Sequence, residues 1–494
     1  MAKAMPLRNQ HPIQNLMNNP GSALLRPNAT YMALAQAARL VVQAVYFFLM
    51  ARGLGPGQYG AFVAVAAAVA IAYPFVGNGS GNLMVKKVAR DRRRLPECLG
   101  NALFITLASG LLLSVVVVPA CLLVLPPAIP LSVILLVVVS DLLVYRFVDV
   151  ACLAFQSVER LGWTANLNVF ASLMRLAGIA AVVLLARPTV VAWSVAYLAT
   201  SAVCALVAMY CVLARLARPA FSGLGRIRRE LREGFWFSTS LSAQTIYNDV
   251  DKTMLARLAT LDAVGIYAAA YRLIDVAFLP IRAVLAAAYP GFFRHGEDGI
   301  AGSLRFARRL VPKPLVYSAA VAAGMTLAAP LVPHILGPQY APTSEALRWL
   351  SLLPLLKTLH YFAADALTGA GHQALRTMVQ IVVAGFNVLV NLWLIPAYSW
   401  RGAAWSSLAS DGLLAAALWS CALLLQTRSA EAVTILRAPD SGVSNGATMK
   451  LYALLILLLA SIFVTAEPPT GGISRSGHLC WNRVCCAEVA VLTD

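Results

Sequence analysis

Apolar runs of about 20 residues recur along the chain from residue 30 to residue 426, and short polar turns separate them. A helix of this length crosses the hydrocarbon core of a bilayer. Runs such as Leu131–Val139 do not alternate, as the strands of a membrane barrel would. The pattern predicts an all-α polytopic membrane protein. We predict twelve spans, at residues 30–51, 61–84, 100–124, 131–154, 163–186, 190–213, 235–257, 265–290, 314–336, 346–370, 377–398 and 402–426, and a shorter candidate at 451–464.

Composition agrees with a membrane protein. Charged residues make up 12% of the 494 positions, about half of the roughly 25% typical of soluble proteins. The net charge of +18 does not indicate nucleic-acid binding, because the basic residues gather in short loops between apolar runs. Those loops alternate in charge, with 25 Lys and Arg on one side of the membrane and five on the other. The positive-inside rule therefore places the N-terminus in the cytoplasm.

An internal repeat divides the chain into two halves. Leu49–Phe62 aligns without a gap with Met254–Tyr267, at an offset of 205 residues. Gly60 matches Gly265 in this alignment, and each copy joins an odd span to the next one. An offset of six spans predicts two parallel six-helix lobes, related by an axis along the membrane normal.

The repeat and the charge pattern together predict the division of the chain. A cytoplasmic tail (1–28) precedes the N-terminal lobe (29–213), and a basic linker (214–234) leads to the C-terminal lobe (235–426). Residues 427–494 form a cytoplasmic loop, the possible thirteenth span and an atypical tail. We expect that an altered reading frame or a truncation after Thr465 replaced a fourteenth helix, so that the last helix pair is incomplete.

Three segments carry a family resemblance that covers about residues 28–430. They are ARGLGPGQYG (51–60), NDVDKTMLARLATLDAVGIYAAAYRL (248–273) and GFNVLVNLWLIPAYSWRGAAWSSLASD (385–411). The chain resembles the polysaccharide-transport branch of the multidrug/oligosaccharidyl-lipid/polysaccharide exporter superfamily. This resemblance implies a flippase that moves an undecaprenyl-diphosphate-linked oligosaccharide across a bacterial inner membrane, for exopolysaccharide, capsule or O-antigen synthesis. Membrane lipid and other polysaccharide-assembly proteins are its implied partners.

Basic side chains inside the predicted spans are candidates for a substrate site. A charged side chain at bilayer depth costs about 2.5–3.5 kcal/mol on insertion scales, so it usually faces the bundle interior and has a function. We predict a cationic cavity for the diphosphate, because arginine matches the geometry of phosphate oxygens. Arg175 has an alternative position near a helix end, from which it would snorkel. The predicted cavity residues are Arg39, Arg175, Arg272, Arg282 and Lys357.

Carboxylates inside the spans allow two interpretations. Asp249 and Asp251 would either bind a coupling ion or join the lobes through fixed ion pairs, together with Lys252 and Asp275. Pairs at i,i+3 can neutralise each other on one helix face. This spacing predicts the pairs Arg146–Asp149, Arg272–Asp275 and Asp249–Lys252.

Two other functions remain as alternatives to the flippase. One is a cation-coupled exporter of small molecules, and the other is a membrane glycan polymerase or ligase, which the short outer loops disfavour. Asp249-Val250-Asp251 matches a glycosyltransferase pattern but lies in a span, and Gly77–Gly81 lacks the lysine of a phosphate-binding loop. The glycines instead predict a bend or a close helix approach. His478, Cys480, Cys485 and Cys486 fit no standard zinc spacing, so we expect no metal and no cofactor.

Overall fold

The structure is a computed structural model that describes residues 20–185, 188–220, 238 and 249–436, and all its elements are helices. Eight helices among these residues are long and apolar enough to cross a membrane, and a bent pair raises the number to nine. The predicted all-helical polytopic fold is therefore confirmed.

The described residues contain fewer spans than the predicted twelve because two predicted spans share one helix, one lies largely outside the described residues and one is short. The first two predicted spans share the helix α2 (Pro20–Ala72), in which only Gly55 leaves the helical conformation (φ 73°, ψ 169°). Of the span predicted at 235–257, Ser238 and residues 249–257 are described. The span predicted at 346–370 corresponds largely to α16 (Leu353–Gly369). Its 17 residues are fewer than the about 20 that cross a bilayer.

The first half of the described chain comprises α2 and the helices up to α8. A π-helical turn at Val139–Val144 joins α5 to α6, so that they form one span. Thr189 caps the last of these helices, since its hydroxyl accepts a hydrogen bond from the Ala192 backbone N–H. The bounds are α3 (Ser80–Arg90), α4 (Leu95–Val124), α5 (Leu131–Val138), α6 (Arg146–Ser157), α7 (Leu161–Leu185) and α8 (Val190–Arg215).

The second predicted span, 61–84, is broken in the middle. Here α2 ends at Ala72, and a glycine-rich turn leads into α3. Gly77 and Gly79 have φ angles of 74° and 71°, a left-handed conformation that glycine adopts without steric cost. The bend expected at Gly77–Gly81 is confirmed. It divides the predicted span 61–84, which the sequence pattern placed in one helix.

The second half comprises a helix at 249–258 and the helices from α10 to α18. The first two labelled helices of this half form the bent pair, with an angle of 48° between them. Pro280, at the start of α11, cannot donate the backbone hydrogen bond that a straight helix needs. The bounds are α10 (Leu261–Ala277), α11 (Leu279–Gly296), α12 (Gly299–Leu310), α13 (Pro312–Ala328), α14 (Val332–Leu336), α15 (Ala341–Leu350), α17 (Gln373–Tyr398) and α18 (Trp400–Leu436).

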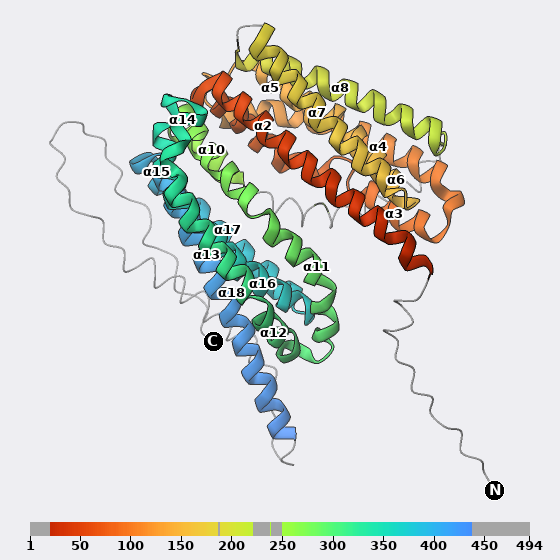
Figure 1. The fold of residues 1–494 in the computed structure, drawn as a ribbon, viewed down its shortest axis with the longest axis vertical. Helices are drawn as coiled ribbons and strands as arrows, with labels where there is room; N and C mark the ends of the chain where they lie inside the picture. Colours follow the sequence, from red (N-terminus) through yellow and green to blue (C-terminus); the bar gives the residue numbers. More distant parts are fainter. Residues whose placement is uncertain (1–19, 186–187, 221–237, 239–248, 437–494) are drawn as a thin grey trace, which may run out of the picture. The chain divides into compact units, whose positions relative to one another are not determined.

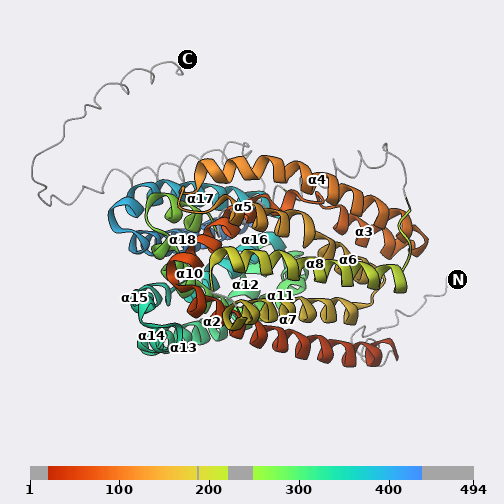
Figure 2. The same cartoon turned by 90° about the horizontal axis from the view of Figure 1, so that it is seen from above.

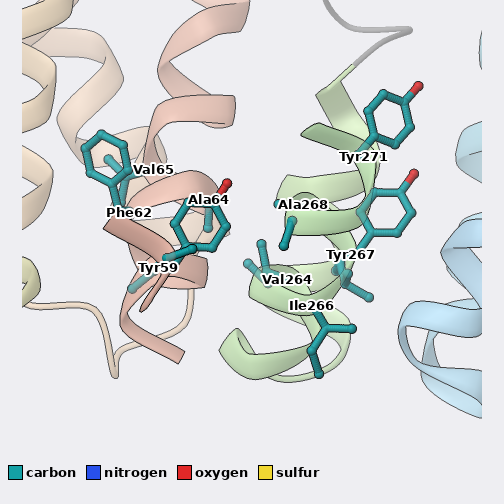
Figure 3. Packing of buried hydrophobic residues seen from close by; sticks show 14 of the residues in the cluster. Tyr59, Phe62, Ala64, Val65, Val264, Ile266, Tyr267, Ala268 and Tyr271 are labelled. Atoms are coloured by element: carbon teal, nitrogen blue, oxygen red, sulfur yellow. The ribbon is translucent and has the colours of Figure 1, made fainter. Parts of the chain in front are cut away.

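The two halves meet along α2 and α10, which pack against each other (Figure 1; Figure 2). The contact buries Tyr59 and Ala64 of α2 on the side of Val264 and Ala268 of α10 (Figure 3). Tyr267 points from the opposite side of α10 (Figure 3). The helix α10 therefore packs one face against the first half, and its opposite face lies within the second half.

Two glycines that the repeat aligns with each other form the closest part of this contact. A Cβ on Gly60 would lie 1.9 Å from the Leu261 carbonyl oxygen, and one on Gly265 would lie 2.0 Å from the Pro56 carbonyl oxygen. Pro56 and Leu261 are also separated by the repeat offset of 205, since 261 − 56 = 205. Such a reciprocal contact is what two copies related by a two-fold axis produce.

The boundaries of the predicted lobes remain predictions. Residues 221–237 lie outside the described residues, and with them most of the linker at 214–234. The described chain up to Ser429 belongs to one compact unit. The candidate span at 451–464 and the cysteine-containing tail also lie outside the described residues.

Candidate functional site

Three of the predicted cationic side chains line one cavity. Arg39 of α2, Arg175 of α7 and Arg272 of α10 border a space of about 310 Å³, which we call the arginine cavity. Its lining comes from both halves of the chain, since α10 belongs to the second half. The structure therefore brings together residues that lie up to 233 positions apart, since 272 − 39 = 233.

Arg175 is held in this cavity by tyrosine rings. Its guanidinium carbon lies 3.5 Å from the ring centre of Tyr197 and 5.0 Å from that of Tyr145, and its Nη2 donates to Ser201 Oγ over 3.3 Å. Aromatic faces attract cations, most strongly where water is excluded. Because Arg175 lies within α7 and not near its ends, the alternative of a snorkelling position is wrong.

The other two arginines keep donor groups for a ligand. The Arg39 Nε is buried and has no hydrogen-bond partner in the part of the chain that the structure describes. Within the same part of the chain, Arg272 makes no ion pair. A buried donor without an acceptor costs about 1–3 kcal/mol, more when it is charged. An anionic ligand would remove that cost.

One predicted ion pair forms with a different partner. Asp275 pairs with Arg282, with 3.2 Å between Oδ1 and Nη2, and not with Arg272 as the i,i+3 spacing predicted. The residues of the observed pair are about two helical turns apart, so they share a face, and the bend between α10 and α11 lies between them. The pairs Arg146–Asp149 (3.0 Å) and Asp249–Lys252 (2.5 Å) confirm the other two predictions.

Arg282 and Lys357 do not lie in the arginine cavity. Arg282 lines an adjoining space of about 540 Å³, together with Arg39 and Arg272 and with mostly apolar side chains, which we call the apolar cavity. Lys357 of α16 is buried beside Tyr271, and its Nζ donates to the Tyr271 hydroxyl over 2.8 Å. Neither side chain borders the arginine cavity, so a role of Arg282 and Lys357 in substrate binding stays a prediction.

The carboxylate candidates separate into two environments. Asp249, Lys252 and Asp275 border a third space of about 390 Å³, which also contacts Arg175 and Arg272. Asp251 points elsewhere and is buried among side chains of the second half. Asp249, Lys252 and Asp275 can therefore contact a ligand that binds Arg175 and Arg272, whereas Asp251 cannot.

Family comparison identifies the class of protein to which this cavity belongs. The family model described as "Polysaccharide biosynthesis protein" matches residues 25–295, which is more than half of the chain. The chain belongs to the polysaccharide biosynthesis protein family. A search of curated protein sequences finds no significant match.

Solved structures show the fold of this family member. An inward-facing multidrug resistance MATE family transporter of the MOP superfamily matches with a TM-score of 0.66 at 15% identity, over 83% of this chain and 100% of that one. The lipid II flippase MurJ in an inward closed conformation matches with a TM-score of 0.60 at 13% identity, over 87% and 98%. A MOP superfamily transporter from Pyrococcus furiosus matches with a TM-score of 0.55 at 15% identity, over 85% of this chain and 98% of that one. The fold is that of a MOP superfamily transporter.

Sequence reasoning missed the uncharged part of the arginine cavity. Tyr46, Tyr145 and Tyr197 line it, and the Tyr197 hydroxyl donates to Asp141 Oδ1 over 2.8 Å. Tyrosines in apolar runs are usually core residues, so only the position of Ser201 one helical turn after Tyr197 indicated a polar face. Asp141 balances part of the arginine charge without pairing directly with an arginine among the described residues.

Asp251 has a hydrogen-bonded environment within the second half. Its Oδ2 accepts a hydrogen bond from the Tyr267 hydroxyl and lies 3.4 Å from Ser407 Oγ, and its Oδ1 accepts from the Lys252 backbone N–H over 2.7 Å. Only 4% of this residue is exposed. These contacts connect the helix at 249–258 with α10 and α18, so Asp251 does not join the two halves. Its role in ion coupling stays a prediction.

The buried Asp251 makes a stability prediction possible. We expect Tyr267→Phe to lower the free energy of unfolding by about 1–3 kcal/mol, because the buried carboxylate loses a hydroxyl donor. Tyr340→Phe is the matched control, since its buried hydroxyl donates to the neutral Ala51 carbonyl over 2.9 Å. Thermal unfolding of the two purified variants in one detergent measures the difference. Equal losses of unfolding free energy in the two variants would contradict a charged Asp251 carboxylate that accepts a hydrogen bond from the Tyr267 hydroxyl.

Proposed function

We propose that this protein is a flippase that moves an undecaprenyl-diphosphate-linked oligosaccharide across the bacterial inner membrane by alternating access. The arginine cavity is the observation that carries the proposal. It lies between the two halves of a transporter-type fold, in a member of the polysaccharide biosynthesis protein family.

The charge of the arginine cavity suits a diphosphate. Three guanidinium groups face one carboxylate, Asp141, around its lining. Arginine binds phosphate oxygens through pairs of parallel hydrogen bonds, which a sugar or an apolar drug cannot accept in the same way. The unpartnered Nε of Arg39 is one such donor.

The apolar cavity suits the prenyl chain of the same substrate. Its walls include Leu40, Phe47 and Val276, and it shares Arg39 and Arg272 with the arginine cavity. A lipid diphosphate has this distribution of chemistry, with a charged group at the end of an apolar chain. The name of one structural neighbour, a lipid II flippase, supports a lipid-linked substrate for this fold.

A cation-coupled exporter of small molecules is the second candidate. The multidrug resistance transporters among the structural neighbours and the buried Asp251 favour it. Such an exporter is expected to bind its cationic substrates at an acidic, aromatic cavity. The arginine cavity is aromatic but basic, so we prefer the flippase.

Deleting the gene in its host tests the proposal. We expect lipid-linked repeat units to accumulate on the cytoplasmic face and surface polysaccharide to fall, and a plasmid copy to restore both. A membrane-impermeant lectin, applied to spheroplasts and to inverted vesicles, measures on which face the glycans lie. Glycans on the outer face of deletion spheroplasts at the wild-type level would refute the flippase. Normal polysaccharide with new sensitivity to small cationic compounds would favour the exporter.

A further inference from the structure

A cavity lined by residues of the first half of the chain and by Ser238 lies beside the arginine cavity and has a different chemistry. It has a volume of about 560 Å³, and we call it the polar cavity. We propose that it binds the sugar residues of the lipid-linked substrate while the arginines hold the diphosphate. This inference rests on the proposed function and assigns a separate part of the substrate to a separate part of the protein.

Hydroxyl and amide side chains recur along the lining of the polar cavity. Such groups both donate and accept hydrogen bonds, as the hydroxyls of a sugar do. Pockets of about 300–1,000 Å³ hold ligands the size of small oligosaccharide fragments. The small polar uncharged residues of the lining are Ser80, Asn82, Thr106, Gln156, Thr164, Asn168 and Ser238.

Several polar groups of the lining have no hydrogen-bond partner in the part of the chain that the structure describes. The Ser80 hydroxyl and the Arg146 Nη2 make no hydrogen bond among the described residues, although the two residues are only 3% and 6% exposed. The Asn168 amide nitrogen donates to the Thr164 carbonyl over 2.9 Å, so its oxygen is left to accept. Because buried polar groups are nearly always paired in native proteins, these groups indicate a ligand.

The broken second span supplies one wall of the polar cavity. Gly77 and Gly79 lie in the turn, and Ser80 and Gly81 begin α3. The Ser80 backbone N–H donates to the Gly77 carbonyl over 2.8 Å, so the side chains of this wall, and not that N–H, are available to a ligand. A Cβ on Gly81 would lie 2.5 Å from the Leu153 Cδ1, so α3 and α6 approach each other closely at this wall.

The charges of the polar cavity cancel, which distinguishes it from a phosphate site. Arg146 pairs with Asp149 over 3.0 Å, and the Tyr73 hydroxyl donates to the same carboxylate over 2.9 Å. Tyr73 lines both the polar cavity and the arginine cavity. A sugar attached to a diphosphate in the arginine cavity would therefore reach the polar cavity across this ring.

Binding of two related lipids to the purified full-length protein in nanodiscs tests the proposal. The first probe is the lipid-linked oligosaccharide extracted from the deletion strain. The second is undecaprenyl diphosphate, which has the same lipid and diphosphate but no sugar. We expect Gln156→Ala and Asn168→Ala to weaken binding of the first probe about five- to tenfold each, as for the loss of one hydrogen bond, and to leave the second unchanged.

Matched controls separate the possible outcomes. Asn166→Ala changes an amide on the same helix α7 that lies outside the polar cavity, and it should leave both affinities unchanged. Gln156→Ala decides the test, because the Gln156 side chain makes no hydrogen bond to the described residues and its loss should not affect folding. Equal weakening of both probes, or of neither, would overturn the sugar site. Failure of the wild type to bind either probe would overturn the proposed function as well.

Discussion

Replacing Gly60 or Gly265 with alanine should reduce polysaccharide export about 5- to 100-fold. The added Cβ would lie 1.9 Å from the Leu261 carbonyl oxygen or 2.0 Å from the Pro56 carbonyl oxygen, so α2 and α10 would have to separate. Overpacking of this kind costs about 1–3 kcal/mol, and about 1.4 kcal/mol changes an equilibrium tenfold. We therefore expect the conformation in which these helices touch to lose most of its population. Surface polysaccharide in a complemented deletion strain measures the effect.

Other glycines in the membrane helices provide the controls. A Cβ on Gly385 of α17 or on Gly412 of α18 would meet nothing within 4 Å. Alanine there should preserve export and leave thermal stability unchanged or slightly raised, since alanine has the higher helix propensity. If Gly60→Ala and Gly385→Ala exported equally well, the close contact of α2 with α10 would not matter for transport.

Replacing Arg272 with alanine should reduce export about 10- to 100-fold. A hydrogen bond to a charged group contributes about 1.5–3 kcal/mol, and Arg272 borders all three spaces between the halves. Arg39→Ala and Arg175→Ala should have effects of similar size, because the same cavity contains both side chains. Each variant should accumulate lipid-linked units in proportion to the export that it loses, and extraction of these lipids measures the accumulation.

An exposed arginine provides the control for the charge itself. Arg401 pairs with Glu345 through two hydrogen bonds of 2.8 and 2.7 Å at an exposed position. Arg401→Ala should change export less than twofold, since exposed ion pairs contribute only about 0–1 kcal/mol. If Arg272→Ala had as small an effect as Arg401→Ala, the arginine cavity would not bind the diphosphate.

Arg282 and Lys357 distinguish the structure from the sequence-based prediction. On the sequence alone, both rank equally with Arg39, because neither has an acidic neighbour within four residues. In the structure Arg282 is neutralised by Asp275, and Lys357 contacts the Tyr271 hydroxyl outside the arginine cavity. Their replacement by alanine should therefore reduce export less than the replacement of Arg272.

The sequence by itself determined the features that depend on local geometry. Runs of about 20 apolar residues predicted the helices, since a bilayer demands that length. The i,i+3 spacing predicted the pairs Arg146–Asp149 and Asp249–Lys252, because a helix places such residues on one face. The repeat also aligned Gly60 with Gly265, where the backbones of α2 and α10 leave no room for a Cβ.

Only the tertiary structure decided which residues share a cavity. The tyrosines around Arg175, the polar side chains around Gln156 and the position of Lys357 depend on how each helix is rotated and where it is broken. Helix breaks at Gly55, Gly77 and Phe278 set those rotations, and sequence periodicity carries no information across a break. The local sequence therefore determines which segments form helices. The packing of those helices determines which polar side chains come together.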